Sequence, residues 1–119
     1  MVQAFKAAFR GLRAAWFEER HLKIHTLAIG GVSLAAMYLG VSRTEWALLV
    51  LCFGLVTGLE YANSALERLA NRVTTERDPW IRDAKDMAAA AVLVASMAAA
   101  AVGLLVLGPP LVEQLGIRL

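Results

Sequence analysis

Three polar side chains follow one another at the end of a long apolar segment. Glu60, Asn63 and Glu67 come directly after the run from Trp46 to Leu59, which contains no charged residue. In a helix, residues three, four and seven positions apart lie on one face, so these side chains form a single polar stripe. Placing a carboxylate at membrane depth costs from about 2.5 kcal/mol upward. We therefore expect the stripe to face a cation or a substrate.

The two carboxylates of the stripe are expected at different depths. Glu60 follows Trp46 by fourteen residues, or about 21 Å of helix, which puts it near the cytoplasmic boundary of the bilayer. Glu67 lies about 10 Å further along the helix, at or beyond that boundary. Because a desolvated carboxylate takes up a proton readily, the deeper one suits a general base.

Further polar residues are expected on the same side of the membrane. Glu19 precedes the first apolar run, and Lys85 precedes the third. Two carboxylates together with phosphate oxygens commonly hold Mg²⁺, and a lysine supplies a point charge to phosphate. This set is compatible with phosphoryl transfer to a hydroxyl embedded in the membrane. Because the chain has no glycine-rich phosphate loop of the soluble type, a nucleotide site must be built from other parts.

The composition predicts an integral membrane protein. Of the 119 residues, 59% are hydrophobic and 18% are charged, against about a quarter charged in a typical soluble domain. The apolar residues also lie in long runs. We expect one domain over residues 1–119 and no nucleic-acid partner. One copy offers too little protein around Glu60 to shield it, so we also expect association with further copies.

The basic residues fall into two clusters, one before the first apolar run and one between the second and the third. The clusters are Lys6, Arg10, Arg13, Arg20 and Lys23, then Arg68, Arg72, Arg77, Arg82 and Lys85, with only Arg43 and Arg118 elsewhere. The positive-inside rule makes both clusters cytoplasmic, which predicts a cytoplasmic N-terminus and an outer C-terminus. The alternative is that these cations serve only as topology signals and phospholipid contacts.

The expected elements are one interfacial helix and three membrane spans. Residues 2–22 alternate apolar and basic side chains at helical spacing, as in a helix that lies in the cytoplasmic interface. Packing of this helix on another protein is the alternative. The spans are expected over residues 24–41, over 46–72 with a cytoplasmic extension, and within a helix over 79–107.

A few residues mark where these helices begin and end. Asp78 before Pro79 predicts a helix start, since an N-cap side chain is followed by proline at the first helical position. Residues 109–110 are both proline and are expected to end the last helix, leaving a short outer tail. A short polar turn is expected over residues 42–45, between the first two spans.

The histidines and the cysteine are first interpreted structurally. His21 and His25 are four residues apart where the interfacial helix meets the first span. That spacing could hold a metal ion, but no third ligand of a suitable type lies nearby in the sequence, which favours contacts with the interface or with lipid headgroups. Cys52 is the single cysteine, so it forms no disulfide within the chain and is expected to be a small buried hydrophobe.

Three motifs resemble those of the prokaryotic diacylglycerol kinase and undecaprenol kinase family. They are Glu60-x-x-Asn63-Ser64-Ala65-x-Glu67, then Ala84-Lys85-Asp86, and Gly11-Leu12-Arg13-Ala14-Ala15-Trp16 with Glu19 three residues later. The resemblance implies small protomers, each with an interfacial helix and three spans, that form a homotrimer with shared active sites. It also implies ATP- and Mg²⁺-dependent phosphorylation of a lipid hydroxyl in the bacterial inner membrane.

The resemblance implies a role for each matching residue. Glu60 would be the catalytic base, and Glu19 and Glu67 would hold Mg²⁺ together with ATP. The ATP contacts implied are Glu19, Glu67, Glu76, Lys85 and Asp86. The lipid substrate contacts implied are Arg13, Ala14, Ala15, Trp16, Glu60 and Asn63.

The motifs leave two lipids open. The N-terminal Gly-Leu-Arg-Ala-Ala-Trp is closer to the diacylglycerol kinase pattern, whereas His25 is closer to the undecaprenol kinase pattern. Arg77 and Asp78 follow Glu76 where many diacylglycerol kinases have Tyr-His, and Asn71 stands where an acid is common. We expect phosphorylation of diacylglycerol to phosphatidic acid, with undecaprenol as the alternative acceptor.

Two other classes of protein are alternatives to a kinase. A small proton-coupled transporter would use Glu60 as its titrating group, which accounts for a carboxylate inside the membrane. It would not account for the acids and the lysine gathered at the cytoplasmic side. In a purely structural interpretation, the polar stripe would be a seam between subunits.

Overall fold

The chain is almost wholly α-helical. The computed structural model describes residues 1–74 and 76–116, so Thr75 and Arg118 lie outside the described part. The helices of the described part are α1 (Val2–Glu18), α2 (Arg20–Leu39), α3 (Arg43–Val73) and α4 (Pro79–Gln114). Of these, α2, α3 and α4 are long and apolar enough to cross a membrane. The predicted all-α membrane fold, an N-terminal helix followed by three spans, is confirmed.

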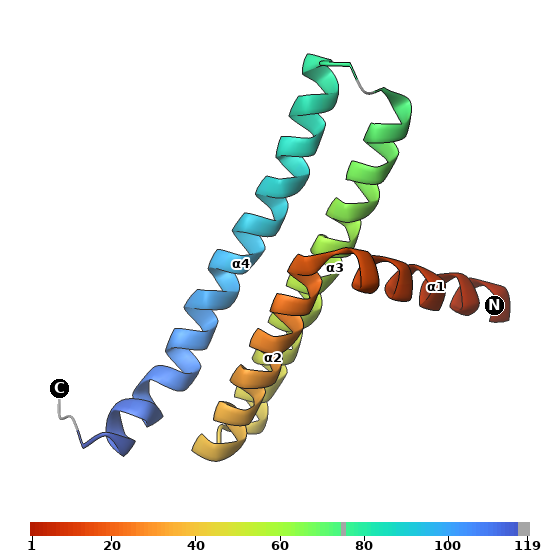
Figure 1. Ribbon diagram of the computed structural model, residues 1–119. Coiled ribbons are helices and arrows are strands. Elements are labelled where there is room, and N and C mark those ends of the chain that lie inside the picture. Colours follow the sequence, from red (N-terminus) through yellow and green to blue (C-terminus); the bar gives the residue numbers. More distant parts are fainter. Residues whose placement is uncertain (75, 117–119) are drawn as a thin grey trace.

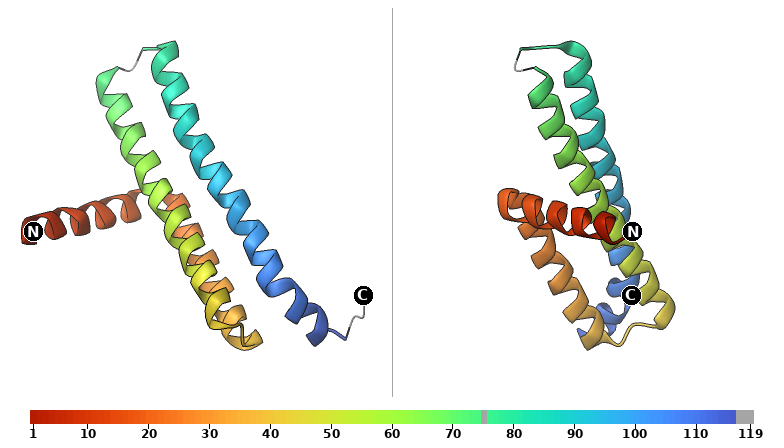
Figure 2. Two further views of the ribbon diagram at one scale, coloured as in Figure 1. Left: turned by 180° about the vertical axis from the view of Figure 1, so that it is seen from behind. Right: turned by 90° about the vertical axis from the view of Figure 1, so that its right-hand side faces the viewer.

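The three long helices run side by side, and α1 lies across them (Figures 1 and 2). The direction of α3 is opposite to that of α2 and α4, and the most extensive contact in the chain is between α3 and α4. At the end where they are joined, α3 and α4 reach well past the level of α1. The second span was expected to extend beyond the membrane, and that this end faces the cytoplasm stays a prediction.

The change of direction between α1 and α2 takes place at one residue. We predicted an interfacial helix over residues 2–22, but α1 ends at Glu18 and α2 begins at Arg20. Glu19 between them is extended, with φ −101° and ψ 112°. An extended residue breaks the helical hydrogen-bond ladder, which lets the chain turn from the line of α1 into the bundle.

The turn between α2 and α3 is shorter than predicted. Gly40 caps α2 in the left-handed region at φ +66°, where glycine pays no steric penalty. Ser42 Oγ accepts from the Glu45 backbone N–H at 3.1 Å, while Glu45 Oε1 accepts from the Ser42 N–H at 3.0 Å. This reciprocal cap starts α3 at Arg43. The turn predicted over residues 42–45 is therefore wrong, because residues 43–45 are already helical.

The start of α4 is as predicted, but its end is not. Asp78 Oδ1 accepts from the backbone N–H groups of Trp80 and Ile81, at 2.9 and 3.3 Å. Pro109 and Pro110 do not stop the helix at residue 107, since α4 continues to Gln114. Each proline removes one backbone donor, but membrane helices tolerate prolines because local adjustments and neighbouring groups satisfy the freed carbonyls.

A small apolar cluster joins the three spans at the end far from the α3–α4 extension. Ala36 of α2, Leu49 of α3 and Val106 of α4 are buried there, with Trp46 and Phe53 packed against them. Elsewhere the long helices expose many large apolar side chains, as lipid-facing surfaces do. Cys52, expected to be buried, is only half-buried on α3.

The Asp78 cap gives a stability prediction. Replacing Asp78 by alanine leaves the N–H groups of the first turn of α4 without their side-chain acceptor, which costs about 1 kcal/mol. We expect Asp78→Ala to unfold at a lower temperature than the wild type when both are followed by circular dichroism in the same detergent. Asp83→Ala is the matched control, because Asp83 is exposed and makes only a 3.7 Å contact with Arg82. Equal losses in both variants would contradict the capping role.

Candidate active site

Glu60 is the one charged residue that is buried in the described part of the chain. It is 8% exposed on α3, and its Oε1 lies 3.2 Å from Nε2 of His25 on α2. The expectation that a single copy would leave Glu60 unshielded is therefore wrong. The shielding comes from the helices of one chain, which pack around the carboxylate.

Two oxygen atoms of the polar stripe are buried without a hydrogen-bond partner among the described residues. They are Oε2 of Glu60 and Oδ1 of Asn63, on residues that lie one turn apart on α3. A buried acceptor that lacks a donor costs about 1–3 kcal/mol. A hydroxyl group that enters from outside the chain would satisfy an acceptor of this kind.

The N-terminal helix is held against α3 just beyond Glu60. The Tyr61 hydroxyl donates to the backbone carbonyl of Leu12 at 2.9 Å. Arg68 Nη2 lies 2.7 Å from Glu18 Oε2 at the end of α1. These contacts place α1 at the level of the polar stripe, and the sequence analysis missed both because nothing in the local pattern signals them.

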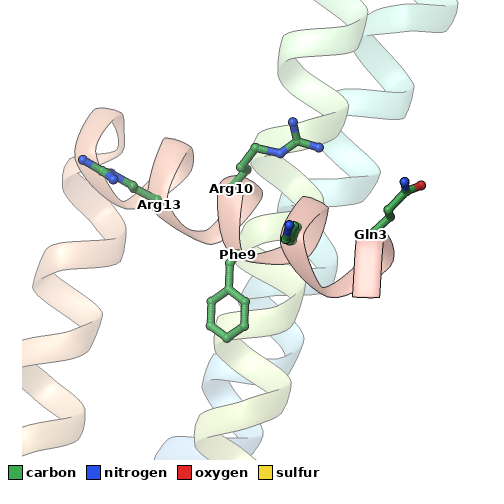
Figure 3. A pocket seen from close by; sticks show the side chains of 5 residues that line it. Gln3, Phe9, Arg10 and Arg13 are labelled. Atoms are coloured by element: carbon green, nitrogen blue, oxygen red, sulfur yellow. The ribbon is translucent and has the colours of Figure 1, made fainter. Parts of the chain in front are cut away.

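A hollow of about 550 Å³ on α1 is made of basic and apolar side chains. Its lining residues are Gln3, Lys6, Phe9, Arg10 and Arg13. Figure 3 shows Phe9 and Arg10 pointing to opposite sides of α1. Such a helix can place aromatic residues in lipid and guanidinium groups among headgroups, as predicted for an interfacial helix.

The residues predicted to contact lipid do not all face the same hollow. Ala14 and Ala15 line a second hollow of about 530 Å³ between α1 and α3, together with Tyr61 and Ser64. Arg13 lines the hollow on α1 instead. Trp16 is 38% exposed beside this region. The small alanine side chains leave space next to the turn of α3 that follows Glu60.

A third hollow, which we call the α3–α4 cleft, lies where these two helices extend beyond α1. Its volume is about 550 Å³. The residues that line it are Glu67, Asn71, Thr74, Glu76, Arg77, Asp78, Pro79, Ile81, Arg82, Lys85 and Asp86. Four of the five residues predicted to contact ATP are therefore gathered in one place. The fifth, Glu19, is at the α1–α2 junction and is not among the lining residues.

The charges of the α3–α4 cleft suit a phosphate that carries a metal ion. Lys85 Nζ donates to Oδ1 of Asn71 at 2.8 Å. Because an amide carries no charge, this bond orients the ammonium group without neutralising it. Arg77 and Arg82 add two further cations to the lining. The lining also carries four carboxylates, those of Glu67, Glu76, Asp78 and Asp86, which can face a metal ion.

The donor atoms also fit a divalent ion brought in by a nucleotide. Within residues 1–74 and 76–116, no three His, Cys, Asp or Glu side chains are grouped as a metal site. Mg²⁺ is commonly bound by only one or two carboxylates, with phosphate oxygens and water completing the octahedron. Glu67 offers such a carboxylate inside the cleft, next to cations that can hold the phosphates.

His25 is the site residue whose role the sequence analysis missed. It was interpreted together with His21 as an interfacial or headgroup contact, but the structure places it on Glu60. One signal was present in the sequence. The predicted span over residues 24–41 contains no Asp, Glu, Lys or Arg, so His25 is its strongest polar group and the natural partner for a buried carboxylate in the next span.

Comparison with known proteins identifies the family of this chain. Residues 6–107 match the family described as prokaryotic diacylglycerol kinase. An undecaprenol kinase of Bacillus subtilis is 31% identical over 109 residues, which cover 92% of this chain and 89% of the relative. A diacylglycerol kinase of Helicobacter pylori is 40% identical over 94 residues, covering 76% and 73% of the two chains.

A third relative extends the comparison. A diacylglycerol kinase of Escherichia coli is 33% identical over 99 residues, covering 83% of this chain and 81% of the relative. The family match spans the polar stripe of α3 and every residue that lines the α3–α4 cleft. The chain therefore belongs to the prokaryotic diacylglycerol kinase family and is a lipid kinase of the diacylglycerol kinase type.

Proposed function

We propose that this protein transfers the γ-phosphate of ATP to the hydroxyl of diacylglycerol, giving phosphatidic acid and ADP. The observation that carries the proposal is the buried Oε2 of Glu60, which has no hydrogen-bond partner among the described residues. The next residue, Tyr61, is bonded to Leu12 of α1, so Glu60 lies close to the level at which α1 crosses α3. The hollow between α1 and α3, where we place the lipid, is lined by Tyr61, the residue that follows Glu60. The α3–α4 cleft, with its cations and carboxylates, supplies the matching place for a nucleotide.

Glu60 acts as the general base in this proposal. Its Oε2 accepts the hydroxyl proton as the O–H bond breaks and the lipid oxygen bonds to the γ-phosphorus. The bond from the γ-phosphorus to the bridging oxygen of the β-phosphate breaks, and ADP leaves with that electron pair. Asn63, one turn further on α3, offers beside the reacting hydroxyl its Oδ1, which has no hydrogen-bond partner among the described residues.

The nucleotide is held by the α3–α4 cleft. Lys85 contacts the phosphates, and Glu76 and Asp86 complete the contacts around ATP. Glu67 and Glu19 provide the carboxylates for Mg²⁺, which offsets the charge of the phosphate oxygens when it is bound. Because Glu67 lies seven residues beyond Glu60 on α3, or about 10 Å along the helix, the two substrates meet end to end.

Undecaprenol is the alternative acceptor. Its hydroxyl, like the free hydroxyl of diacylglycerol, is an alcohol group at the polar end of a lipid. The lipid would lie against Ala14, Ala15 and Trp16, in the hollow between α1 and α3, with Arg13 near the headgroups. Relatives carrying each of the two names match this chain. Diacylglycerol is preferred here because the N-terminal motif has the diacylglycerol kinase pattern.

We further propose an inner-membrane homotrimer with a cytoplasmic N-terminus. The orientation is supported by the two basic clusters and by the need of the α3–α4 cleft to reach cytoplasmic ATP. Association is supported by the small share of residues that each span buries within one chain, from 11% to 17%. In a trimer, active sites would be shared between neighbouring subunits, and Glu19 could join Glu67 across such an interface.

The choice of lipid is tested by supplying each acceptor in turn. We expect purified protein in bicelles to turn over ATP when diacylglycerol is added, with a higher kcat/KM than with undecaprenol. A diacylglycerol whose free hydroxyl is methylated is the matched control, and it should give only the background rate. Faster turnover with undecaprenol would reverse the assignment, and turnover with neither lipid would overturn the proposed function.

The role of Glu60 is tested by Glu60→Gln, which keeps the size of the side chain and removes its basicity. General bases contribute roughly 10²- to 10⁴-fold, so kcat should fall at least about 100-fold. The circular dichroism spectrum and the elution volume should be unchanged. Glu113→Gln makes the same chemical change near the far end of α4, on an exposed residue, and should retain wild-type kcat. Full activity in Glu60→Gln would remove Glu60 from the role of base.

The role of Glu67 is tested through the metal dependence. Glu67→Gln removes a charged oxygen ligand from the α3–α4 cleft, so the Mg²⁺ concentration for half-maximal rate should rise about tenfold or more, together with the KM for ATP. The KM for diacylglycerol should not change, because Glu67 lies beyond the lipid site. A Mg²⁺ dependence equal to that of Glu113→Gln would place the metal elsewhere.

A further inference from the structure

We propose that His25 is a positioning residue for Glu60, which it holds by one carboxylate oxygen so that the other is directed to the lipid hydroxyl. This inference rests on the proposed role of Glu60 as the base. In this proposal α2 orients the carboxylate of Glu60, which no residue of the polar stripe or of the α3–α4 cleft does.

The two oxygens of Glu60 have different surroundings. Oε1 lies 3.2 Å from Nε2 of His25, whereas Oε2 is buried without a partner among the described residues. The Glu60 side chain is 10% exposed, so water contributes little to holding either oxygen. A carboxylate with one fixed and one free oxygen has a defined direction, and the free oxygen is the one available to accept a proton.

Histidine suits this position for a chemical reason. A neutral imidazole that carries its proton on Nε2 can donate to Oε1, and a protonated imidazole can do so as a cation. The His25 side chain is 33% exposed, so it reaches from the buried carboxylate toward the edge of α2. Without this donor, the carboxylate would turn freely about its last torsion, since such terminal torsions have broad minima.

The chemical step itself is unchanged by this assignment. Oε2 takes the hydroxyl proton, the hydroxyl oxygen bonds to the γ-phosphorus, and ADP leaves with the electrons of the broken phosphorus–oxygen bond. His25 neither gains nor loses an atom. Replacing His25 should therefore lower kcat with the lipid acceptor. It should not weaken the binding of ATP, which takes place in the α3–α4 cleft.

The experiment compares two substitutions of His25. We expect His25→Leu to lower kcat with diacylglycerol about tenfold or more, while the KM for ATP stays within twofold of the wild type. His25→Gln should recover most of that loss, because its amide nitrogen can reach about as far as Nε2 and can donate to Oε1. The matched control is His21→Leu, since His21 is exposed one turn earlier on α2 and should retain the wild-type kcat.

Coupling to Glu60 separates positioning from a general packing effect. In a Glu60→Gln background, His25→Leu should cause no further fall in rate, because the group that it positions is already gone. A further tenfold fall in the double variant, or a rate in His25→Gln no higher than in His25→Leu, would overturn the positioning role. An unchanged kcat in His25→Leu would overturn it as well.

A spectroscopic measurement tests the pair without relying on activity or on a folded His25 variant. In protein labelled with ¹⁵N-histidine, Glu60→Gln should shift the imidazole nitrogen resonances of His25 and leave those of His21 in place. Unshifted His25 resonances would overturn the proposed contact. Wild-type protein that phosphorylates neither lipid would instead overturn the proposed function, so the two failures are distinguishable.

Discussion

The structure depends on how the chain accommodates one carboxylate in an apolar helix. Glu60 is buried on α3, where desolvation of a charge is expensive unless polar groups compensate. The chain compensates only in part, with one contact from His25 on α2 and no partner for Oε2 among the described residues. If both oxygens of Glu60 accepted hydrogen bonds from the chain, the carboxylate would serve only the structure. Because Oε2 lacks a donor among the described residues, it can accept a hydrogen bond from an entering hydroxyl group.

The remaining elements place two different environments on either side of this residue. On one side, α2, α3 and α4 are joined by an apolar cluster around Leu49. On the other side, α3 and α4 continue without α2, and the cleft between their ends is lined by charged side chains. Between the two levels, α1 lies across the bundle, tied to α3 through Tyr61 and Arg68. The lipid site and the nucleotide site proposed above therefore lie at different levels of the same helix, α3.

The short segment around Glu19 makes this arrangement possible. If α1 and α2 formed one continuous helix, α1 could not lie in the interface while α2 crosses the membrane. The extended backbone at Glu19 separates them and leaves its carboxylate at the junction, half-buried and outside the α3–α4 cleft. The distribution of the proposed metal ligands, with Glu67 in the cleft and Glu19 away from it, is consistent with a site completed between subunits, as proposed above for the trimer.

The sequence by itself determined the helices, the three spans and the polar stripe of Glu60, Asn63 and Glu67, because these depend on spacing and composition over short distances. The Asp78 cap is equally local, and it is confirmed. Two other local predictions were wrong. The prolines at 109 and 110 were expected to end α4, but the helix continues through them. Residues 42–45 were expected to form a turn, because the cap that Ser42 makes at the start of α3 was not recognised.

Only the tertiary structure decided which side chains meet across helices. The bond from Tyr61 to Leu12 joins residues 49 apart in the chain, and the pair of Arg68 with Glu18 joins residues 50 apart. The contact of His25 with Glu60 likewise depends on how α2 rotates and slides against α3. Periodicity within one helix carries no information on that register. Packing sets it, and packing thereby decides that Oε1 of Glu60 lies beside His25 while Oε2 has no hydrogen-bond partner among the described residues.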